Sequence, residues 1–331
     1  MSRRKLFKCL GLSAWAILLL ALLTPGGVSA QARKLVPMKV GTVPIANLLP
    51  FYAALHKGFF EEEGLKVEEV PMAGGAWIIN AIAGGSVEIG LVNTTSHLLA
   101  YDQGFDIKMV APPYRENCDP VPGSTLPYGG QNAILVGKDS AIRTAKDVEG
   151  KKVAVVGLKS IDWFMMSEWM KKNGADPEKI IWVESGFPQM PAMLASGQID
   201  VAVVTEPFHT LIVGTGGRVL DYTFCSVRKG VTVAYFAASE RWIRGHGDLV
   251  EKFVRAYNRA VDYVYAHPEE RVDIVTKYTR ARPELIRKMI WTNWTKRADL
   301  DDLQWWISLI QSYNLLKRKF HASDIVHKTA Q

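Results

Sequence analysis

The stretch AIAGGSVEIGLVNTTSHLL, Ala81 to Leu99, has a counterpart in MLASGQIDVAVVTEPFHTL, Met193 to Leu211, which begins 112 residues further along the chain. Each copy reads as the end of a helix, a glycine turn, an acidic residue and a short apolar strand, and then polar residues that open another helix. One such copy would mean little, because any parallel α/β protein repeats these parts. Two copies in register over nineteen residues predict two domains of one design, each with a helix N-terminus after the repeated strand.

The composition is that of a globular protein of about two domains, with 331 residues, 48% of them hydrophobic and 22% charged. Residues 1–30 are set apart, because a basic start with Arg3 and Arg4 precedes an apolar run from Leu10 to Leu23 and then Val28-Ser29-Ala30. This order predicts a secretory signal peptide that is cleaved after Ala30. The apolar run is shorter than the roughly 20 residues of a membrane span. The ordinary secretory and the twin-arginine routes both stay open.

The formal net charge of +7 comes partly from that N-terminal segment. The remaining chain shows no stripe of Lys and Arg with interleaved aromatic residues, so no nucleic-acid partner is expected. Two cysteines follow the segment, Cys118 and Cys225. In an oxidising compartment they could form one disulfide or stay as two free thiols, and the sequence leaves both alternatives open.

The order of strands and helices predicts two lobes joined by two crossings. Residues 37–111 alternate strands and helices, and residues 112–130 are rich in proline and read as a hinge crossing. Residues 131–221 repeat the first plan, and 222–230 form the second crossing. We expect a strand at 231–238 to return to the first lobe, so that 231–331, mostly helical, completes it. Expected helices include residues 51–63, a start at Asp147, 249–266, 283–294 and 300–316.

Ligands of open α/β sheets bind at the carboxyl ends of the strands. Six loops would leave strand ends and face a cleft between the lobes. These loops are residues 44–48, 73–77, 93–96, 158–163, 184–189 and 205–208. Helix N-termini in such loops offer free N–H groups and a partial positive charge, which suits a small polar ligand.

Four segments carry a resemblance to a known family: LLPFYAALHKGFFEEEGLKVEEV, GGAWIINAIAGGSVEIGLVN, KDSAIRTAKDVEGKKVAVVG and ASGQIDVAVVTEPF. They resemble the periplasmic substrate-binding proteins of ABC importers for nitrate, taurine and aliphatic sulfonates, a family that includes thiamine-precursor binders. The resemblance implies an α/β fold of the type II periplasmic-binding-protein class: two doubly wound lobes, a hinge and a helical C-terminal region. It implies a monomeric periplasmic protein that delivers a small organic solute to an inner-membrane permease and ATPase. No cofactor, metal or catalytic residue is implied.

Carried over by position, the resemblance implies a set of ligand-binding residues. They are Asn47, Trp77, Asn93, Thr94, Thr95, Ser160, Trp163 and Glu206. The sequence departs from the family at Thr205, where members often have Trp, and at Lys159, which stands in a loop where a small residue is usual. Glu206 would favour a ligand with an amino group, or it caps its own helix; both interpretations stay open.

Two other functions compete with transport. A pyrimidine-synthase-like enzyme has the same fold, and a secreted ligand-sensing protein would bind without a permease. The sequence contains no H-E-x-x-H, C-x-x-C, G-x-S-x-G or G-x-x-x-x-G-K-[ST] motif. His56, His97 and His209 are isolated on predicted helices, where a structural role is expected.

Overall fold

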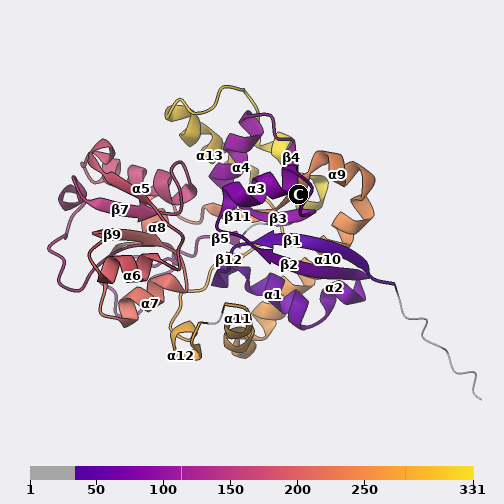
Figure 1. The fold of residues 1–331 in the computed structure, drawn as a ribbon, viewed down its shortest axis with the longest axis horizontal. Coiled ribbons are helices and arrows are strands. Elements are labelled where there is room, and N and C mark those ends of the chain that lie inside the picture. The colour runs from indigo at the N-terminus through magenta and orange to yellow at the C-terminus, as the bar shows by residue number, and fades with distance from the viewer. Residues whose placement is uncertain (1–33, 113, 280) are drawn as a thin grey trace, which may run out of the picture. The chain divides into compact units, whose positions relative to one another are not determined.

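The computed structural model describes residues 34–112, 114–279 and 281–331. It contains two β-sheets, a larger and a smaller one, which lie side by side (Figure 1). The predicted signal peptide at 1–30 lies outside the described residues. Residues 35–331 form one compact unit. No helix in the described ranges is both long and apolar enough to cross a membrane.

The larger sheet has the strand order β12-β5-β11-β3-β1-β2, with β4 paired to β11. Its strands are β1 Val36–Thr42, β2 Leu65–Pro71, β3 Ile89–Asn93, β4 Ile107–Met109, β5 Tyr114–Arg115, β11 Thr232–Ser239 and β12 Asn293–Trp294. The smaller sheet has the order β10-β6-β9-β7-β8. Its strands are β6 Ala133–Val136, β7 Lys152–Val155, β8 Ile181–Glu184, β9 Val201–Val204 and β10 Arg218–Asp221.

Helices flank both sheets, and helices α5 to α8 belong to the side of the smaller one. The helices are α1 Leu49–His56, α2 Phe59–Glu62, α3 Gly75–Ala83, α4 Thr94–Asp102, α5 Ile161–Lys172, α6 Met190–Ala195, α7 Phe208–Gly214, α8 Thr223–Val227, α9 Glu240–Gly245, α10 Gly247–Ala266, α11 Arg271–Thr279, α12 Pro283–Ile286 and α13 Leu300–Ser312. This is the predicted α/β architecture of two doubly wound halves.

The repeated stretch occupies equivalent places in the two sheets. Strand β3 lies between parallel β1 and antiparallel β11, and β9 lies between parallel β7 and antiparallel β6. The repeated acids play equivalent roles, since Glu88 accepts a hydrogen bond from the Lys39 N–H at 2.6 Å and Asp200 accepts one from the Lys152 N–H at 2.8 Å. Each acid therefore fixes the register of the repeated strand against its parallel neighbour.

The strand at 231–238 does return to the first sheet, as predicted, because β11 pairs with β3, β4 and β5. Cys118 and Cys225, one from each predicted crossing, form a disulfide with Cα atoms 5.5 Å apart. We propose that the division into lobes follows the two sheets, with 112–130 and 222–230 as hinge crossings.

Four helix predictions were wrong in extent, and the helix expected at 300–316 already ends at Ser312. The helix expected at 51–63 is broken into α1 and α2, because Gly58 takes a left-handed conformation with φ of 74°. The start at Asp147 yields one 3-10 turn, Lys146–Val148. The helix expected at 283–294 ends at Ile286, and β12 pairs with β5 instead. Tertiary pairing overrides the helical periodicity there.

Candidate functional site

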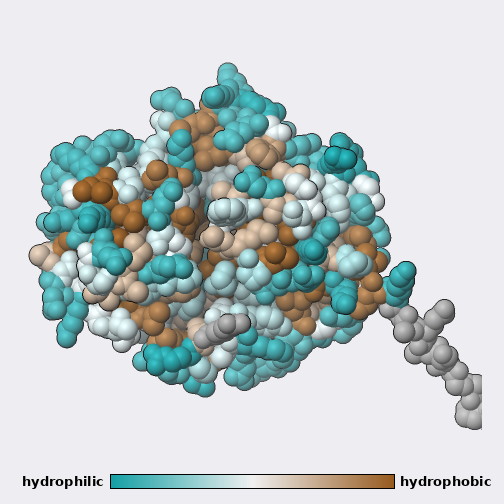
Figure 2. Space-filling view, in the orientation of Figure 1, coloured by the Kyte–Doolittle hydropathy of each residue, from teal (hydrophilic) through white to brown (hydrophobic). Residues whose placement is uncertain are grey.

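A cavity of about 60 Å³ lies where the carboxyl ends of strands from both sheets meet. Each of the six predicted loops contributes to its wall, which confirms that they face one site. The contributing loop residues are Ile45, Ala73, Gly74, Gly75, Asn93, Ile161, Asp162, Phe187 and Thr205. A neighbouring pocket of about 150 Å³ shares Val43, Ile45, Ala73 and Phe187 with it. Figure 2 shows the surface hollowed along the boundary between the two halves.

The cavity has space for roughly four waters, or for a solute with about as many heavy atoms. Residues outside the six loops also line the wall. They include Tyr114 of β5, Asn132 just before β6, and Val233 and Ala234 of β11. The sequence analysis missed these four. Tyr114 reaches the strand ends because β5 pairs with β11, which pairs with β3, and Asn132 does so because β6 pairs with β9.

Asn47 connects the two halves at the cavity. Its Nδ2 donates to Thr205 Oγ1 at 3.5 Å, and its side chain also hydrogen-bonds Tyr114. The Asn47 carbonyl accepts from the indole N–H of Trp294 at 2.7 Å. The unexpected strand β12 therefore contributes to the site, because it holds Trp294 under the Asn47 loop.

Asn93 ends β3, caps α4 and lines the cavity. Its Oδ1 accepts from the Ser96 N–H at 2.9 Å and from Thr95 Oγ1 at 3.2 Å, the expected arrangement at a helix N-cap. A Cβ at Gly75 would lie 2.8 Å from Asn93 Nδ2, so only glycine leaves this amide its place. Among the described residues no acceptor is bonded to Nδ2, which is free to donate to a ligand.

The two threonines after Asn93 are buried and differ in role. Thr94 Oγ1 donates to the carbonyls of Thr232 and Val233 at 2.9 and 3.2 Å, which fixes α4 against β11. Thr95 Oγ1 donates to the Lys159 carbonyl at 3.4 Å and so joins the two halves. Lys159 adopts φ of 62°, and the loop turns there to present α5.

Ser160 is the N-cap of α5 and accepts from the Trp163 N–H at 3.4 Å. Two residues later, Asp162 lines the cavity and is only 2% exposed. Its Oδ2 is buried with no hydrogen-bond partner among the described residues. Burial without compensation raises the pKa of Asp162 to about 7. This aspartate is therefore an unsatisfied acceptor in the wall of the site.

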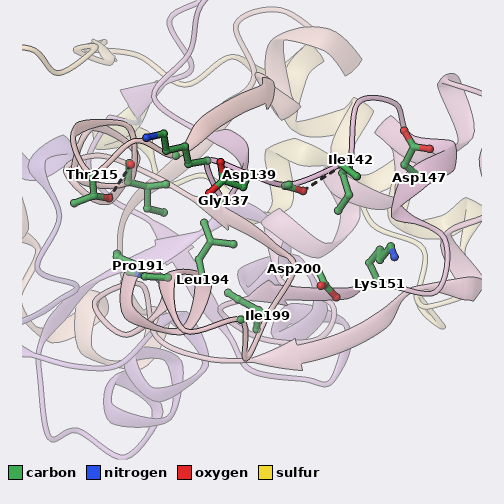
Figure 3. A pocket seen from close by; sticks show the side chains of 17 residues that line it. Gly137, Asp139, Ile142, Asp147, Lys151, Pro191, Leu194, Ile199, Asp200 and Thr215 are labelled. Carbon is green, nitrogen blue, oxygen red and sulfur yellow. Dashed lines mark hydrogen bonds between the residues drawn. The ribbon is translucent and has the colours of Figure 1, made fainter.

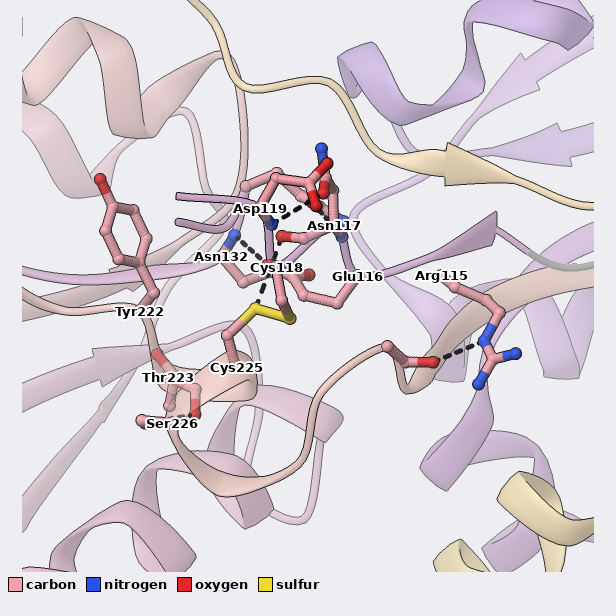
Figure 4. Close-up of a disulfide and its surroundings, with 12 residues drawn as sticks. Arg115, Glu116, Asn117, Cys118, Asp119, Asn132, Tyr222, Thr223, Cys225 and Ser226 are labelled. Carbon is pink, nitrogen blue, oxygen red and sulfur yellow. Dashed lines mark hydrogen bonds between the residues drawn. A yellow bond between two sulfur atoms is a disulfide. The ribbon is translucent and has the colours of Figure 1, made fainter. Parts of the chain in front are cut away.

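A second buried carboxylate, Glu116, lies beside the disulfide and near the same cavity (Figure 4). It accepts from the Asn132 N–H at 3.0 Å and from Asn132 Nδ2 at 2.5 Å. Burial is the main cause that raises the pKa of Glu116 to about 8, and the negative charge of Asp162 raises it further. Burial foremost, and then the charges of Glu116 and Asp162, raise the pKa of Tyr114.

Glu206 does not belong to the cavity wall, contrary to expectation. Its oxygens accept from Thr210 N–H at 3.0 Å, Thr210 Oγ1 at 2.8 Å and Ile290 N–H at 3.1 Å. The carboxylate therefore holds the first turn of α7 and the chain after α12. The interpretation as a helix cap is the one that fits, because these three bonds tie both oxygens to α7 and to the chain after α12.

The two predicted tryptophans also lie away from the cavity wall. Trp163 packs against Trp182, Phe164 and Tyr313, with ring centroids 5.0 to 5.9 Å apart. It thereby joins α5 to the end of α13. Trp77, in the first turn of α3, is 67% exposed. Sequence position alone placed both residues in cleft loops, but their side chains turn towards a helix interface and towards solvent.

A larger pocket of about 710 Å³ lies at the opposite end of the smaller sheet (Figure 3). Two of its three acids already have internal partners: Asp147 accepts from the N–H groups of Arg143 and Thr144, and Asp200 from that of Lys152, while the third, Asp139, is exposed. It lies at the amino ends of β7 and β9, so the repeated loops do not face it. These observations favour the smaller cavity as the functional site.

His267, Glu269 and Glu270 could together offer three metal ligands within 4.8 Å. They lie at the surface, and Glu270 is held by Lys57 at 2.6 Å and by the Tyr263 hydroxyl at 2.5 Å. This cluster therefore reads as an ion-paired surface turn.

Comparison with known proteins finds relatives in sequence and in fold. A 4-amino-5-hydroxymethyl-2-methylpyrimidine phosphate synthase of Saccharomyces cerevisiae is 25% identical over 256 residues, which cover 73% of this chain and 69% of the yeast protein. The riboflavin-binding protein RibY of Chloroflexus aurantiacus is 23% identical over 255 residues, 73% of this chain and 66% of that protein. The alkanesulfonate-binding protein of Xanthomonas axonopodis, solved with MOPS, superposes with a TM-score of 0.72 at 17% identity, over 88% of this chain and 98% of that one.

That superposition establishes the periplasmic-binding-protein fold. The model of the family described as NMT1/THI5 like matches residues 45–271, which include both copies of the repeat and every loop residue named above in the cavity wall. The chain belongs to the NMT1/THI5-like family.

Proposed function

We propose that this protein is the extracytoplasmic solute-binding component of an ABC importer, which captures a small organic solute between its two sheets and delivers it to a permease and ATPase. The observation that carries the proposal is the cavity: six strand-exit loops from two similar halves converge on one small, largely apolar space with a few polar groups. Such a space suits capture of a solute by closure of two halves.

The periplasmic location is part of the same proposal. It is supported by the periplasmic fold of the structural relatives and by the predicted signal peptide. A monomer in solution agrees with a site built from one chain. Osmotic-shock fractionation of a Gram-negative host checks the location; retention of the full-length protein in the cytosol would contradict it.

The similarity to the yeast synthase favours a second candidate, a pyrimidine-phosphate-synthase-like enzyme of the same fold. The two candidates differ in whether the bound molecule survives. We expect a thermal-shift screen of sulfonates, nitrate, pyrimidines and amines to identify a ligand, which should stabilise the fold by about 2.7 kcal/mol at 100 times its Kd. Mass spectrometry after prolonged incubation should recover the ligand unchanged. If the ligand is converted to a product, the transport proposal is wrong and the enzyme candidate takes its place.

A further inference from the structure

The cavity wall carries one buried carboxylate, Asp162, and, among the described residues that line it, no Lys, Arg or His. A second buried carboxylate, Glu116, lies behind the wall residue Asn132. Asp162 is 2% exposed and Glu116 is 1% exposed. Glu116 is satisfied by Asn132, but Asp162 Oδ2 has no partner within the described chain. Buried acids are normally paired or hydrogen-bonded, so this arrangement is incomplete as it stands.

The N-terminus of α5 does not by itself account for Asp162. A helix start favours an acid in its first turn, but here Ser160 supplies the cap and takes the Trp163 N–H. The helix dipole would also stabilise an acid in the first turn that is exposed to solvent, so it does not explain why Asp162 is buried. It gives no reason for leaving the second oxygen buried without a donor. The missing donor is therefore to be sought in the cavity itself.

We propose that Asp162 is the residue that selects the ligand, and that this ligand carries a positively charged nitrogen, an amidinium or a protonated amine, which pairs with the Asp162 carboxylate. The proposal rests on the function proposed above and names the ligand's chemistry. An anion such as nitrate or a simple sulfonate would meet the Asp162 carboxylate in a desolvated space, with Glu116 behind Asn132, and like charges repel strongly there. A planar amidinium can instead donate two parallel N–H bonds to one carboxylate.

Asn93 completes the recognition from the opposite side. Asn93 lines the same cavity from the end of β3 with its Nδ2 free to donate to a ligand, whereas Asp162 lines it from α5 on the other half and can accept. A ligand with a cationic nitrogen at one end and an acceptor at the other would bridge the two halves. Closure of the halves and recognition of the cation would then be one event.

Three isosteric probes test the charge directly, because acetamidinium, acetamide and acetate have nearly the same shape and differ in charge. Titration calorimetry or ligand-observed NMR on the purified wild-type protein, at constant ionic strength, should show acetamidinium binding about 10- to 100-fold more tightly than acetamide, and acetate more weakly than both. Methylammonium, run alongside, separates recognition of a planar amidinium from recognition of an ammonium. Equal affinities, a preference for acetate, or no measurable binding of acetamidinium would overturn the proposal.

Affinity for a cationic ligand and affinity for an anionic ligand should depend on pH in opposite directions. A cation needs ionised Asp162, so its affinity should fall about tenfold per unit as pH drops below about 7. An anion would bind more tightly over the same range. The groups that face Asp162 are Glu116 and Tyr114, and protonation of Glu116 near pH 8 weakens the cation in the same direction. Affinity for acetamidinium that rises with acid would contradict the assignment.

Asp162→Asn should abolish the preference for acetamidinium over acetamide and remove the pH dependence near 7. Asp139→Asn, at an exposed loop of the same half, is the matched control and should change neither. The outcome is separable from that of the proposed function. If a sulfonate or nitrate binds and is recovered unchanged, the transport proposal is supported and the proposal of a cationic ligand is wrong. If an amidine or amine binds and is converted, the proposal of a cationic ligand is supported and the transport proposal is wrong.

Discussion

Asp162 should impose a pH-dependent penalty on folding that Asp162→Asn removes. Burial raises the pKa of this carboxyl from an ordinary value of 3.8 to about 7. The folded protein therefore holds a proton that the unfolded chain releases between about pH 4 and pH 7. Stability of the wild type should fall across that window, by about 1.4 kcal/mol per pH unit, and level off above it. The total loss is on the order of 4 kcal/mol.

The neutral amide at position 162 cannot ionise, so the variant should escape this loss. We expect its advantage over wild type to grow from about pH 4 to pH 7 and then to stay constant. Urea unfolding followed by tryptophan fluorescence, without added ligand, measures both proteins at each pH. The midpoint of thermal unfolding should differ by roughly 5–10 °C near pH 8. Asp139→Asn serves as the control. If wild type and variant show parallel dependences on pH, Asp162 is solvated or paired, and the reasoning fails.

Glu206→Gln should cost about 1–3 kcal/mol of stability, since it weakens the bonds from Thr210 and Ile290, but it should leave ligand selectivity unchanged in calorimetry; a selective loss for amino ligands would restore Glu206 to the site. Replacing Cys118 and Cys225 by Ser opens a loop of 107 residues and should lower stability by up to about 4.7 kcal/mol in the chain-entropy model; two alkylatable thiols in the unreduced wild type would remove the basis of this prediction. Trp294→Phe removes the donor to the Asn47 carbonyl and should cost about 1–3 kcal/mol, with weaker ligand binding; full retention of both by calorimetry and unfolding would show that this bond does not hold the loop.

The sequence predicted which loops form the site, but it did not predict which acidic residue lines the cavity. Periodicity and glycine turns suffice to find buried strands such as β3 and β9, and parallel strands bring their carboxyl ends together. The same reasoning chose Glu206 because it follows a repeated strand. Whether its carboxylate turns to the cavity or to Thr210 depends on side-chain orientation, which spacing does not encode.

The sequence could have identified Asp162, because it lies in one of the predicted loops, two residues after the Ser160 cap. It could not have identified Tyr114 and Asn132. Tyr114 reaches the site through the pairing of β5 with β11, a contact between segments more than 100 residues apart, and Asn132 through the pairing of β6 with β9. Similarly, residues 283–294 have a helical pattern, but Trp294 gains a ladder with Tyr114 and a bond to Asn47 that a helix would forfeit.

The bonds that join the two halves have a consequence for the rate of the proposed capture. Asn47 reaches Thr205, and Thr95 reaches Lys159, so both bonds hold the two halves together. If a solute enters by separation of the halves, these contacts must break first, and an encounter with solute is productive only while they are broken. The observed association rate should then rise with solute concentration and reach a ceiling equal to the opening rate. Trp163 contacts Tyr313 where α13 meets α5, and Lys171 lies over the Tyr313 ring. A change in this contact during each opening should change the fluorescence emission of Trp163.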